Sequence, residues 1–285
     1  PHTGEILSMV GGVDFNKSKF NRALQSKRQP GSSFKPILFA MGLEGPYTPS
    51  TIILDSPEAL AGGEGELRWK PSNYDGKFKG PITFRNALEQ SRNVPTVKIA
   101  EKIGVRQILK YLDRVGFKAN IDENLSLALG SFGVTLLDIV SIYGIFPATG
   151  MRNTPQYIIS IKDRDGKDAD FTSIRYSDNQ TKKEDSEEDA ELEDSSSLGN
   201  ASEELAKTEN PDTTETIKEE VNQFLVDLKD NYVYDKRLAY IMSNLLRGVV
   251  QHGTGRSARE IGQYIGGKTG TTSSYIDAWF IGFSS

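Results

Sequence analysis

Residues 29–36 read Gln-Pro-Gly-Ser-Ser-Phe-Lys-Pro, in which a break at residues 29–31 is followed by the start of a predicted helix. Gly31 frees the backbone for a sharp turn. Ser32 then stands at the start of a helix predicted to run to Leu43. Unpaired N–H groups and the helix dipole favour developing negative charge there. Lys35 follows three residues later on the same face, and the next residue is a proline, whose missing N–H costs little in a first turn.

The pairing of Ser32 with Lys35 is typical of a serine nucleophile activated by a lysine. A serine hydroxyl is a poor nucleophile until a base takes its proton. The chain has two histidines, His2 and His252, and neither has an obvious partner for a Ser-His-Asp triad. A buried lysine near a second cation is pushed towards its neutral form and can act as the base instead. Taken alone, the pair also fits an ordinary helix N-cap followed by a surface lysine.

Two further short motifs carry groups that suit the same chemistry. Ser91-Arg92-Asn93 follows a helical pattern, and its serine can relay a proton while its asparagine binds a peptide amide. Lys268-Thr269-Gly270 lies on a predicted strand, followed by Thr271. The lysine there contributes a fixed positive charge, the threonine hydroxyls can bind a carboxylate, and the glycines keep Cβ atoms away so that a peptide can lie against the strand. Taken alone, each motif also fits an ordinary helix end or strand turn.

Composition excludes several other kinds of site. The 285 residues are enough for a buried core, and the absence of cysteine excludes disulfides, thiolate zinc sites and cysteine nucleophiles. Two distant histidines argue against a histidine metal site, and no basic stripe with interleaved aromatics indicates nucleic-acid binding. We therefore expect no metal, cofactor or nucleic acid. No stretch is typical of a signal peptide, no run of about 18 apolar residues is present, and residues 134–146 are predicted to form a buried helix.

The overall charge of −5 hides a strongly acidic segment. Residues 181–220 hold 15 acidic residues and four lysines, so this segment carries −11 and the other 245 residues carry +6. The little apolar periodicity from about 167 to 220 predicts a disordered insertion, with an acidic docking segment as the alternative. Ser177-Asp178-Asn179 repeats the second motif at the start of this insertion. Nothing there would hold it in place, so Ser91 is preferred.

The remaining pattern predicts a mixed α/β chain of the α+β type. Strands are expected at residues 6–10, 13–15, 157–161, 264–271 and 277–283, the last two forming a hairpin. Further helices are expected at residues 82–90, 96–103, 106–115 and 236–249. Residues 44–82 are rich in glycine, proline, aspartate and serine and are expected to be irregular.

In this order and context, the three motifs resemble those of the transpeptidase domain of class A penicillin-binding proteins. Other segments that look like this family extend the resemblance over nearly the whole chain outside the insertion: Thr3 to Leu7, Arg28 to Ser32, Trp69 to Tyr74, Gly248 to Val250 and Gly253 to Gly255. Two features depart from the family. The insertion is unusually long, and the chain ends before the family's last strands and C-terminal helix.

The resemblance implies a β-lactamase/transpeptidase-like fold, with an antiparallel sheet flanked by helices beside a mostly helical subdomain. It implies one domain over residues 1–285, interrupted by the insertion. It further implies a peptidoglycan transpeptidase that cross-links stem peptides through a serine acyl-enzyme and is acylated by β-lactams. The catalytic residues are then Ser32, Lys35, Ser91 and Lys268. The substrate-binding residues are Asn93, Thr269, Gly270 and Thr271.

The family also implies a role for each group. Ser32 Oγ attacks the D-Ala-D-Ala carbonyl, Lys35 takes its proton, and the backbone N–H groups of Ser32 and Thr271 form an oxyanion hole. Ser91 passes a proton to the leaving D-alanine, supported by Lys268. Family members are anchored to the cytoplasmic membrane, act on its outer face and carry a glycosyltransferase domain, so the same is expected of the parent protein.

Two alternatives to the transpeptidase stay open. A β-lactamase needs a base that activates the deacylating water, and Glu123-Asn124 lacks the spacing used by class A enzymes. A non-catalytic β-lactam sensor is the other alternative, and the intact motif residues argue against it.

Overall fold

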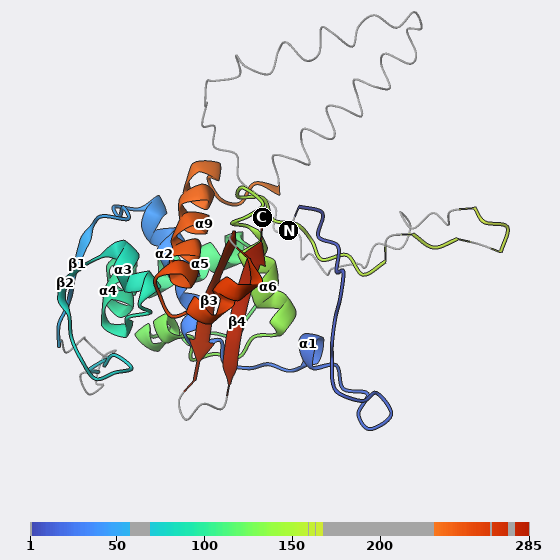
Figure 1. The fold of residues 1–285 in the computed structure, drawn as a ribbon, viewed down its shortest axis with the longest axis horizontal. Coiled ribbons are helices and arrows are strands. Elements are labelled where there is room, and N and C mark those ends of the chain that lie inside the picture. The colour runs from blue at the N-terminus through green and yellow to red at the C-terminus, as the bar shows by residue number, and fades with distance from the viewer. Residues whose placement is uncertain are drawn as a thin grey trace, which may run out of the picture. The chain divides into compact units, whose positions relative to one another are not determined.

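The computed structural model describes residues 2–57, 69–158, 160–162, 164–167, 231–262, 264–272 and 277–284. The chain divides into two compact units, Pro1–Tyr157 with Asn231–Ser285, and Ile158–Asp230. Every helix and strand named below belongs to the first unit (Figure 1). The predicted insertion, together with Ser177-Asp178-Asn179, lies outside the described residues from position 168 onwards.

The first unit is built around helix α2 (Lys35–Glu44), of whose ten residues nine are buried. A helix that is apolar on every side belongs inside a core, and burial of each large apolar side chain contributes about 1.5–3 kcal/mol. Four helices contact α2: α3 (Phe84–Glu89), α4 (Asn93–Ile103), α5 (Val105–Arg114) and α9 (Lys236–Gln251). The helix that begins at the first motif is therefore anchored in the core.

The strands form two antiparallel pairs. Strands β3 (Ile265–Thr271) and β4 (Ala278–Ser284) make the hairpin predicted from the sequence. Helix α9 contacts β3 and helix α6 (Leu136–Gly144) contacts β4 (Figure 1). Strands β1 (Ile52–Asp55) and β2 (Gly80–Thr83) pair inside the stretch that was expected to be irregular. Four-residue strands bounded by glycine and proline show too little alternation to be recognised.

The predicted helices are confirmed, each end falling within three residues of its predicted position. Side chains set several of these ends. Thr83 accepts from the backbone of α3, Thr135 and Asp138 form a capping box on α6, and Asp235 caps α9. Four short elements complete the described part of the unit: α1 (Arg22–Gln25), η1 (Gly31–Phe34), η2 (Leu125–Leu129) and η3 (Arg256–Ile261).

Three predicted strands are wrong. Residues 6–10 and 13–15 form no strand; an isolated bridge joins Glu5 to Gln156 instead, and Leu7 and Val13 are fully exposed. The described residues of 157–161 form no strand, and their side chains are exposed. An alternating pattern predicts a strand only where a partner strand supplies hydrogen bonds and a core covers one face.

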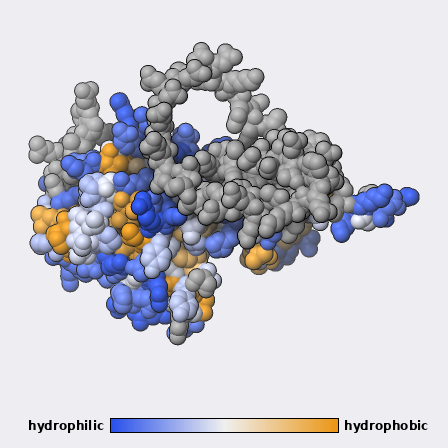
Figure 2. Space-filling view, turned by 90° about the horizontal axis from the view of Figure 1, so that it is seen from above, coloured by the Kyte–Doolittle hydropathy of each residue, from blue (hydrophilic) through white to orange (hydrophobic). Residues whose placement is uncertain are grey.

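The predicted buried helix at residues 134–146 is buried on one face only. Ile139 and Ile142 lie in the core, whereas Leu136 and Val140 line an apolar cavity of 560 Å³ together with residues 4–10 and the end of β4. That cavity contains none of the predicted site residues. On the face shown in Figure 2, hydrophobic residues are scattered among hydrophilic ones. Within the described ranges, no helix is both long and apolar enough to span a membrane.

Candidate active site

Ser32 lies in the 3₁₀ turn η1, which runs directly into α2. Gly31 has φ +53°, a conformation that glycine adopts without strain. Ser33 donates from its hydroxyl to the carbonyl three residues before it at 2.6 Å, and Tyr143 donates to the carbonyl of Ser33 at 2.5 Å. Ser33 is buried, whereas Ser32 is partly exposed and lines a cavity. The turn therefore presents one of its two serines to the cavity.

Three backbone segments meet at this turn with no side chain between them. The N–H of Gly31 donates to the carbonyl of Gly130 at 3.2 Å. A Cβ on Gly31 would lie 2.5 Å from the carbonyl oxygen of Thr271, and a Cβ on Gly130 would lie 2.6 Å from the nitrogen of Gly31. The N–H groups of Ser32 and Thr271, which form the expected oxyanion hole, therefore belong to segments in contact.

The substitution Gly130→Ala is expected to slow acylation by a β-lactam about 10- to 100-fold, because it displaces the turn that carries Ser32. Gly130 has φ +68°, so alanine adds local strain of about 1 kcal/mol to the collision. Gly104→Ala is the matched control, since Gly104 also has a positive φ but no atom within 4 Å of its Cβ position. Acylation rates and unfolding midpoints of both variants test this. An unchanged rate in Gly130→Ala would show that the close approach is not needed.

Lys35 is completely buried, and acceptors from a single turn surround its Nζ. Nζ donates to the carbonyl oxygen of Ser91 at 2.7 Å and to Oδ1 of Asn93 at 2.6 Å, and it lies 3.4 Å from Oγ of Ser91. Burial, followed by the positive charges of Lys268 and Arg92, holds the pKa of Lys35 well below its usual value. The interpretation of Lys35 as a surface lysine is wrong.

Ser91 lies between two lysines, in a left-handed backbone conformation that residues other than glycine rarely adopt. Its φ of +53° costs about 1 kcal/mol in an L-residue. Its Oγ accepts from Nζ of Lys268 at 2.9 Å and faces Nζ of Lys35 at 3.4 Å. A hydroxyl in this place can accept a proton from one nitrogen and pass another on. The interpretation of the second motif as an ordinary helix end does not account for these contacts.

Lys268 is buried as completely as Lys35, and it also donates to the carbonyl of Thr269 at 2.9 Å. Burial lowers the pKa of Lys268 to about 7, because a charged ammonium loses its water shell there. The fixed positive charge expected of Lys268 therefore stays a prediction. When Lys268 is protonated, its charge disfavours a proton on Lys35.

The threonines of β3 face the same cavity. Thr269 and Thr271 line it, and Oγ1 of Thr269 lies 2.6 Å from Oγ1 of Thr254. Thr254 belongs to the Gly253–Gly255 turn after α9. The sequence singled out this turn as a family segment without assigning it a role in the site. A hydroxyl cluster beside a buried lysine suits a carboxylate.

The glycines of β3 make room for protein atoms and not for a peptide. A Cβ on Gly270 would lie 2.6 Å from the carbonyl oxygen of Pro30, and a Cβ on Gly266 would lie 2.6 Å from the ring of Phe283. Gly270 is buried and does not line the cavity. The reason given for these glycines from the sequence is thus wrong: Gly270 lets β3 pack directly on the turn of Ser32.

The cavity into which Ser32 opens has a volume of 740 Å³, within the usual range for ligand sites. The described residues bring Ser32, Ser91, Asn93, Thr269 and Thr271 to its wall, with the two lysines buried behind them. Sequence reasoning missed a buried polar cluster at this wall, made of Asp55, Asn73 and Arg92. Asn73 and Arg92 also line the cavity. Within the described ranges, no group of His, Cys, Asp or Glu side chains is placed to hold a metal ion.

Comparison with known sequences identifies relatives along the whole chain. The profile of the family described as the penicillin binding protein transpeptidase domain matches residues 1–285. The chain is 37% identical to penicillin-binding protein 1A of Rickettsia bellii, covering all of this chain and 32% of the relative. It is 33% identical to penicillin-binding protein 1A of Pseudomonas aeruginosa, covering 34% of that protein. The chain thus spans about a third of the length of these curated relatives.

Solved structures show the same fold. Penicillin-binding protein 1A of Haemophilus influenzae superposes with a TM-score of 0.71 at 28% identity, over 96% of this chain and 39% of that one. An imipenem acyl-enzyme complex of penicillin-binding protein A from M. tuberculosis gives a TM-score of 0.64 at 17% identity, over 93% and 54%. The second likeness supports the fold alone. Both agree with the predicted class of sheet and helices.

Proposed function

The chain belongs to the penicillin-binding protein transpeptidase domain family, and on that premise we propose that it is a serine-type D-Ala-D-Ala transpeptidase that cross-links peptidoglycan stem peptides. One observation carries the proposal: Lys35, a buried lysine with a lowered pKa, contacts Ser91 one helical turn from a serine that opens into the cavity. A neutral lysine in that place supplies the base that the serine needs.

In the first step, Ser32 Oγ attacks the carbonyl carbon of the penultimate D-alanine. The new C–O bond forms while the hydroxyl proton passes to the neutral Nζ of Lys35. The carbonyl oxygen becomes an oxyanion, which the N–H groups of Ser32 and Thr271 stabilise. The contact of Gly31 with the Thr271 backbone supports this arrangement.

In the second step, the peptide C–N bond breaks and the terminal D-alanine leaves. Its nitrogen takes a proton through Ser91, which lies between the two lysine nitrogens. An acyl-enzyme on Ser32 remains. The amine of a second stem peptide then attacks the ester, loses a proton to the same lysine–serine pair, and releases Ser32 with its hydroxyl restored. β-Lactams acylate the same oxygen.

The cavity wall supplies the groups that hold the donor peptide. Asn93 orients the substrate amide, and it is itself fixed because its Nδ2 donates to the carbonyl of Ser72 at 2.9 Å. Thr269 and Thr271 bind the terminal carboxylate. Gly270 lies between them and contributes to this strand through its backbone.

The carboxylates of the cavity favour a transpeptidase over a β-lactamase. Among the described residues that line the cavity, Asp75 is the only carboxylate. Its Oδ2 pairs with Arg92 Nη1 at 2.9 Å, and this bond holds the pKa of Asp75 below its usual value. A carboxylate engaged in this way is a poor base for water. The acyl-enzyme is therefore expected to be long-lived in water.

Labelling with a fluorescent penicillin tests the proposed function. We expect a stable covalent label that mass spectrometry locates on Ser32, with release far slower than labelling. Rapid release would indicate a β-lactamase. Labelling without turnover of a D-Ala-D-Ala peptide would indicate a sensor. A label on any other residue, or none, would contradict the assignment of Ser32.

The whole protein is also open to proposal, because the chain spans about a third of its relatives. We propose that the natural protein carries a glycosyltransferase domain and a membrane anchor. The transpeptidase domain then acts on the outer face of the cytoplasmic membrane, where stem peptides and β-lactams are its ligands.

A further inference from the structure

Helix α4 begins without a cap from the residue that precedes it. The side chain of Arg92, at the N-cap, makes no capping bond. Instead, Oδ1 of Asn73 accepts from the backbone N–H groups of Asn93 at 2.9 Å and Val94 at 3.2 Å. The first N–H groups of a helix need such partners. A residue twenty positions away therefore fixes where α4 starts.

The capping amide is in turn held by a buried ion pair. Nδ2 of Asn73 donates to Oδ1 of Asp55 at 2.7 Å, and Oδ2 of Asp55 accepts from Nε of Arg92 at 2.9 Å. Asp55 is 0% exposed, Asn73 3% and Arg92 5%. A buried ion pair is tolerated when its remaining polar atoms are bonded, and here they are. Asp55, Asn73, Arg92 and the first residues of α4 thus form a closed ring, called here the cap ring.

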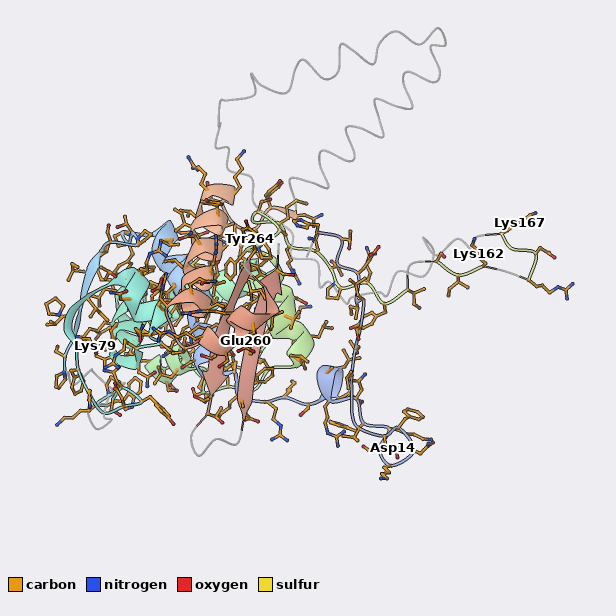
Figure 3. All side chains as sticks on the ribbon, in the orientation of Figure 1. Asp14, Lys79, Lys162, Lys167, Glu260 and Tyr264 are labelled. Atoms are coloured by element: carbon orange, nitrogen blue, oxygen red, sulfur yellow. The ribbon has the colours of Figure 1, made fainter. Side chains whose placement is uncertain are left out.

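The cap ring is tied to the chain on its outer side as well. Arg92 donates from Nη1 to Asp75 at 2.9 Å and from Nη2 to the carbonyl of Lys77. The N–H of Lys79 donates to Oδ2 of Asp55 at 3.1 Å, and Figure 3 places Lys79 beside β1 and β2. Asp55 of β1 and two residues of the segment before β2 therefore converge on the guanidinium that the α3–α4 turn carries.

The turn that this ring encloses carries Ser91 and Asn93, which both contact Lys35. Ser91 has a positive φ, and such a conformation persists only where the surroundings impose it. The two residues that follow the strained position, Arg92 and Asn93, are those that the ring fixes. Without the ring, the strained residue is free to relax and its hydroxyl to leave the two lysines.

We propose that Asp55, Asn73 and Arg92 are positioning residues, which hold the turn 91–93 so that Ser91 and Asn93 face the lysine beside the nucleophile. This inference rests on the proposed function, since it assigns the ring a part in the same acyl transfer. None of the three residues touches the reacting atoms. The effect of Asp55 and Asn73 on the rate is expected to pass through the turn, whereas Arg92 also acts through its charge, which lowers the pKa of Lys35.

The test is a double-mutant cycle made in the full-length protein. The quantity measured is the first-order rate of acylation at saturating penicillin. Asp55→Asn and Asn73→Ser are each expected to lower this rate about tenfold. In a Ser91→Ala background the same substitutions are expected to lower it less than about threefold, because residues that act through one group are not additive. A residue that merely stabilises the fold would produce equal effects in both backgrounds.

Two controls keep the result unambiguous. Glu44→Gln removes an ion pair outside the cavity, in which Nη2 of Arg114 lies 2.6 Å from Oε2 of Glu44. This variant should leave the rate unchanged. Asn73→Ser leaves the charges of the buried pair intact, so it decides the matter if Asp55→Asn does not fold. Unchanged rates in the ring variants, or equal losses in both backgrounds, would overturn the inference. Absence of label on Ser32 in the unmodified protein would overturn the proposed function instead.

Discussion

Lys35→Arg is expected to fold normally and to lose penicillin acylation by about 10³-fold or more, in line with the loss of a general base. Arginine keeps the positive charge but does not release a proton near neutral pH. Lys35 is buried against Ser91 and Asn93, and its pKa is lowered by desolvation and by Lys268 and Arg92. These conditions favour the neutral amine that removes the proton of Ser32.

The rate of acylation by penicillin in the folded variant is the measurement. Lys79→Arg is the matched control, since Lys79 lines the same cavity in an exposed position and its replacement should leave the rate unchanged. Acylation of Lys35→Arg at a near-normal rate would show that this lysine serves only as a positive charge and that another group takes the proton.

The pH dependence of the unmodified protein belongs to the same prediction. The base is the deprotonated form of Lys35, so the rate rises as pH rises through its pKa. An ordinary lysine would place that rise near pH 10.4. Burial and the charges of Lys268 and Arg92 lower the pKa, so the rise is expected at a clearly lower pH. A rise near pH 10 would contradict a neutral Lys35 at physiological pH.

Ser91→Ala is expected to slow acylation about 10²- to 10³-fold, the range of a lost proton relay. The variant removes the hydroxyl oxygen that lies within hydrogen-bonding distance of both Lys35 and Lys268. The carbonyl of Ser91 still accepts from Lys35, so the fold and the burial of the lysine should be preserved. The burst rate of acylation measures the loss of the proton relay, and the unfolding midpoint shows whether the fold has been weakened.

Ser177→Ala is the comparison variant for Ser91→Ala. Ser177 repeats the Ser-x-Asn pattern and lies outside the described residues. Its replacement should be close to silent. Equal effects of the two substitutions, or a larger effect at Ser177, would mean that the second motif had been assigned to the wrong place.

The local patterns of the chain predicted its helices and the β3–β4 hairpin. The apolar side chains of α9 recur at helical spacing, and α2 is a nearly continuous apolar run. The family resemblance implied that Ser32, Lys35, Ser91 and Lys268 share one site. Lys35 and Lys268 both lie beside the hydroxyl of Ser91, and the catalytic roles of the four residues stay a prediction. Such patterns did not predict whether a strand-like segment would find a second strand to pair with. Residues 6–15 alternate as a strand does, yet nothing beside them in the described part of the chain supplies a second strand.

The cap ring shows a second limit. Asp55 and Arg92 are 37 positions apart, and Asn73 lies between them in a stretch with no regular pattern. No spacing rule connects the end of a strand with a distant helix turn, so a buried ion pair of this kind is visible only in three dimensions. Gly270 illustrates the same point. Its sequence context indicates an open strand, whereas its position against Pro30 makes it a packing residue.

The contact of Gly31 with Gly130 and Thr271 constrains how this protein can evolve under antibiotic pressure. Backbone atoms alone make that contact, so a replacement of Gly31 or Gly130 would disturb the turn of Ser32 for the peptide and for a β-lactam alike. Replacements that lower drug affinity are therefore expected in parts of the wall where side chains face the cavity, such as Ser126 and Thr254. Selection for resistance should accumulate changes on that rim and leave the glycines untouched.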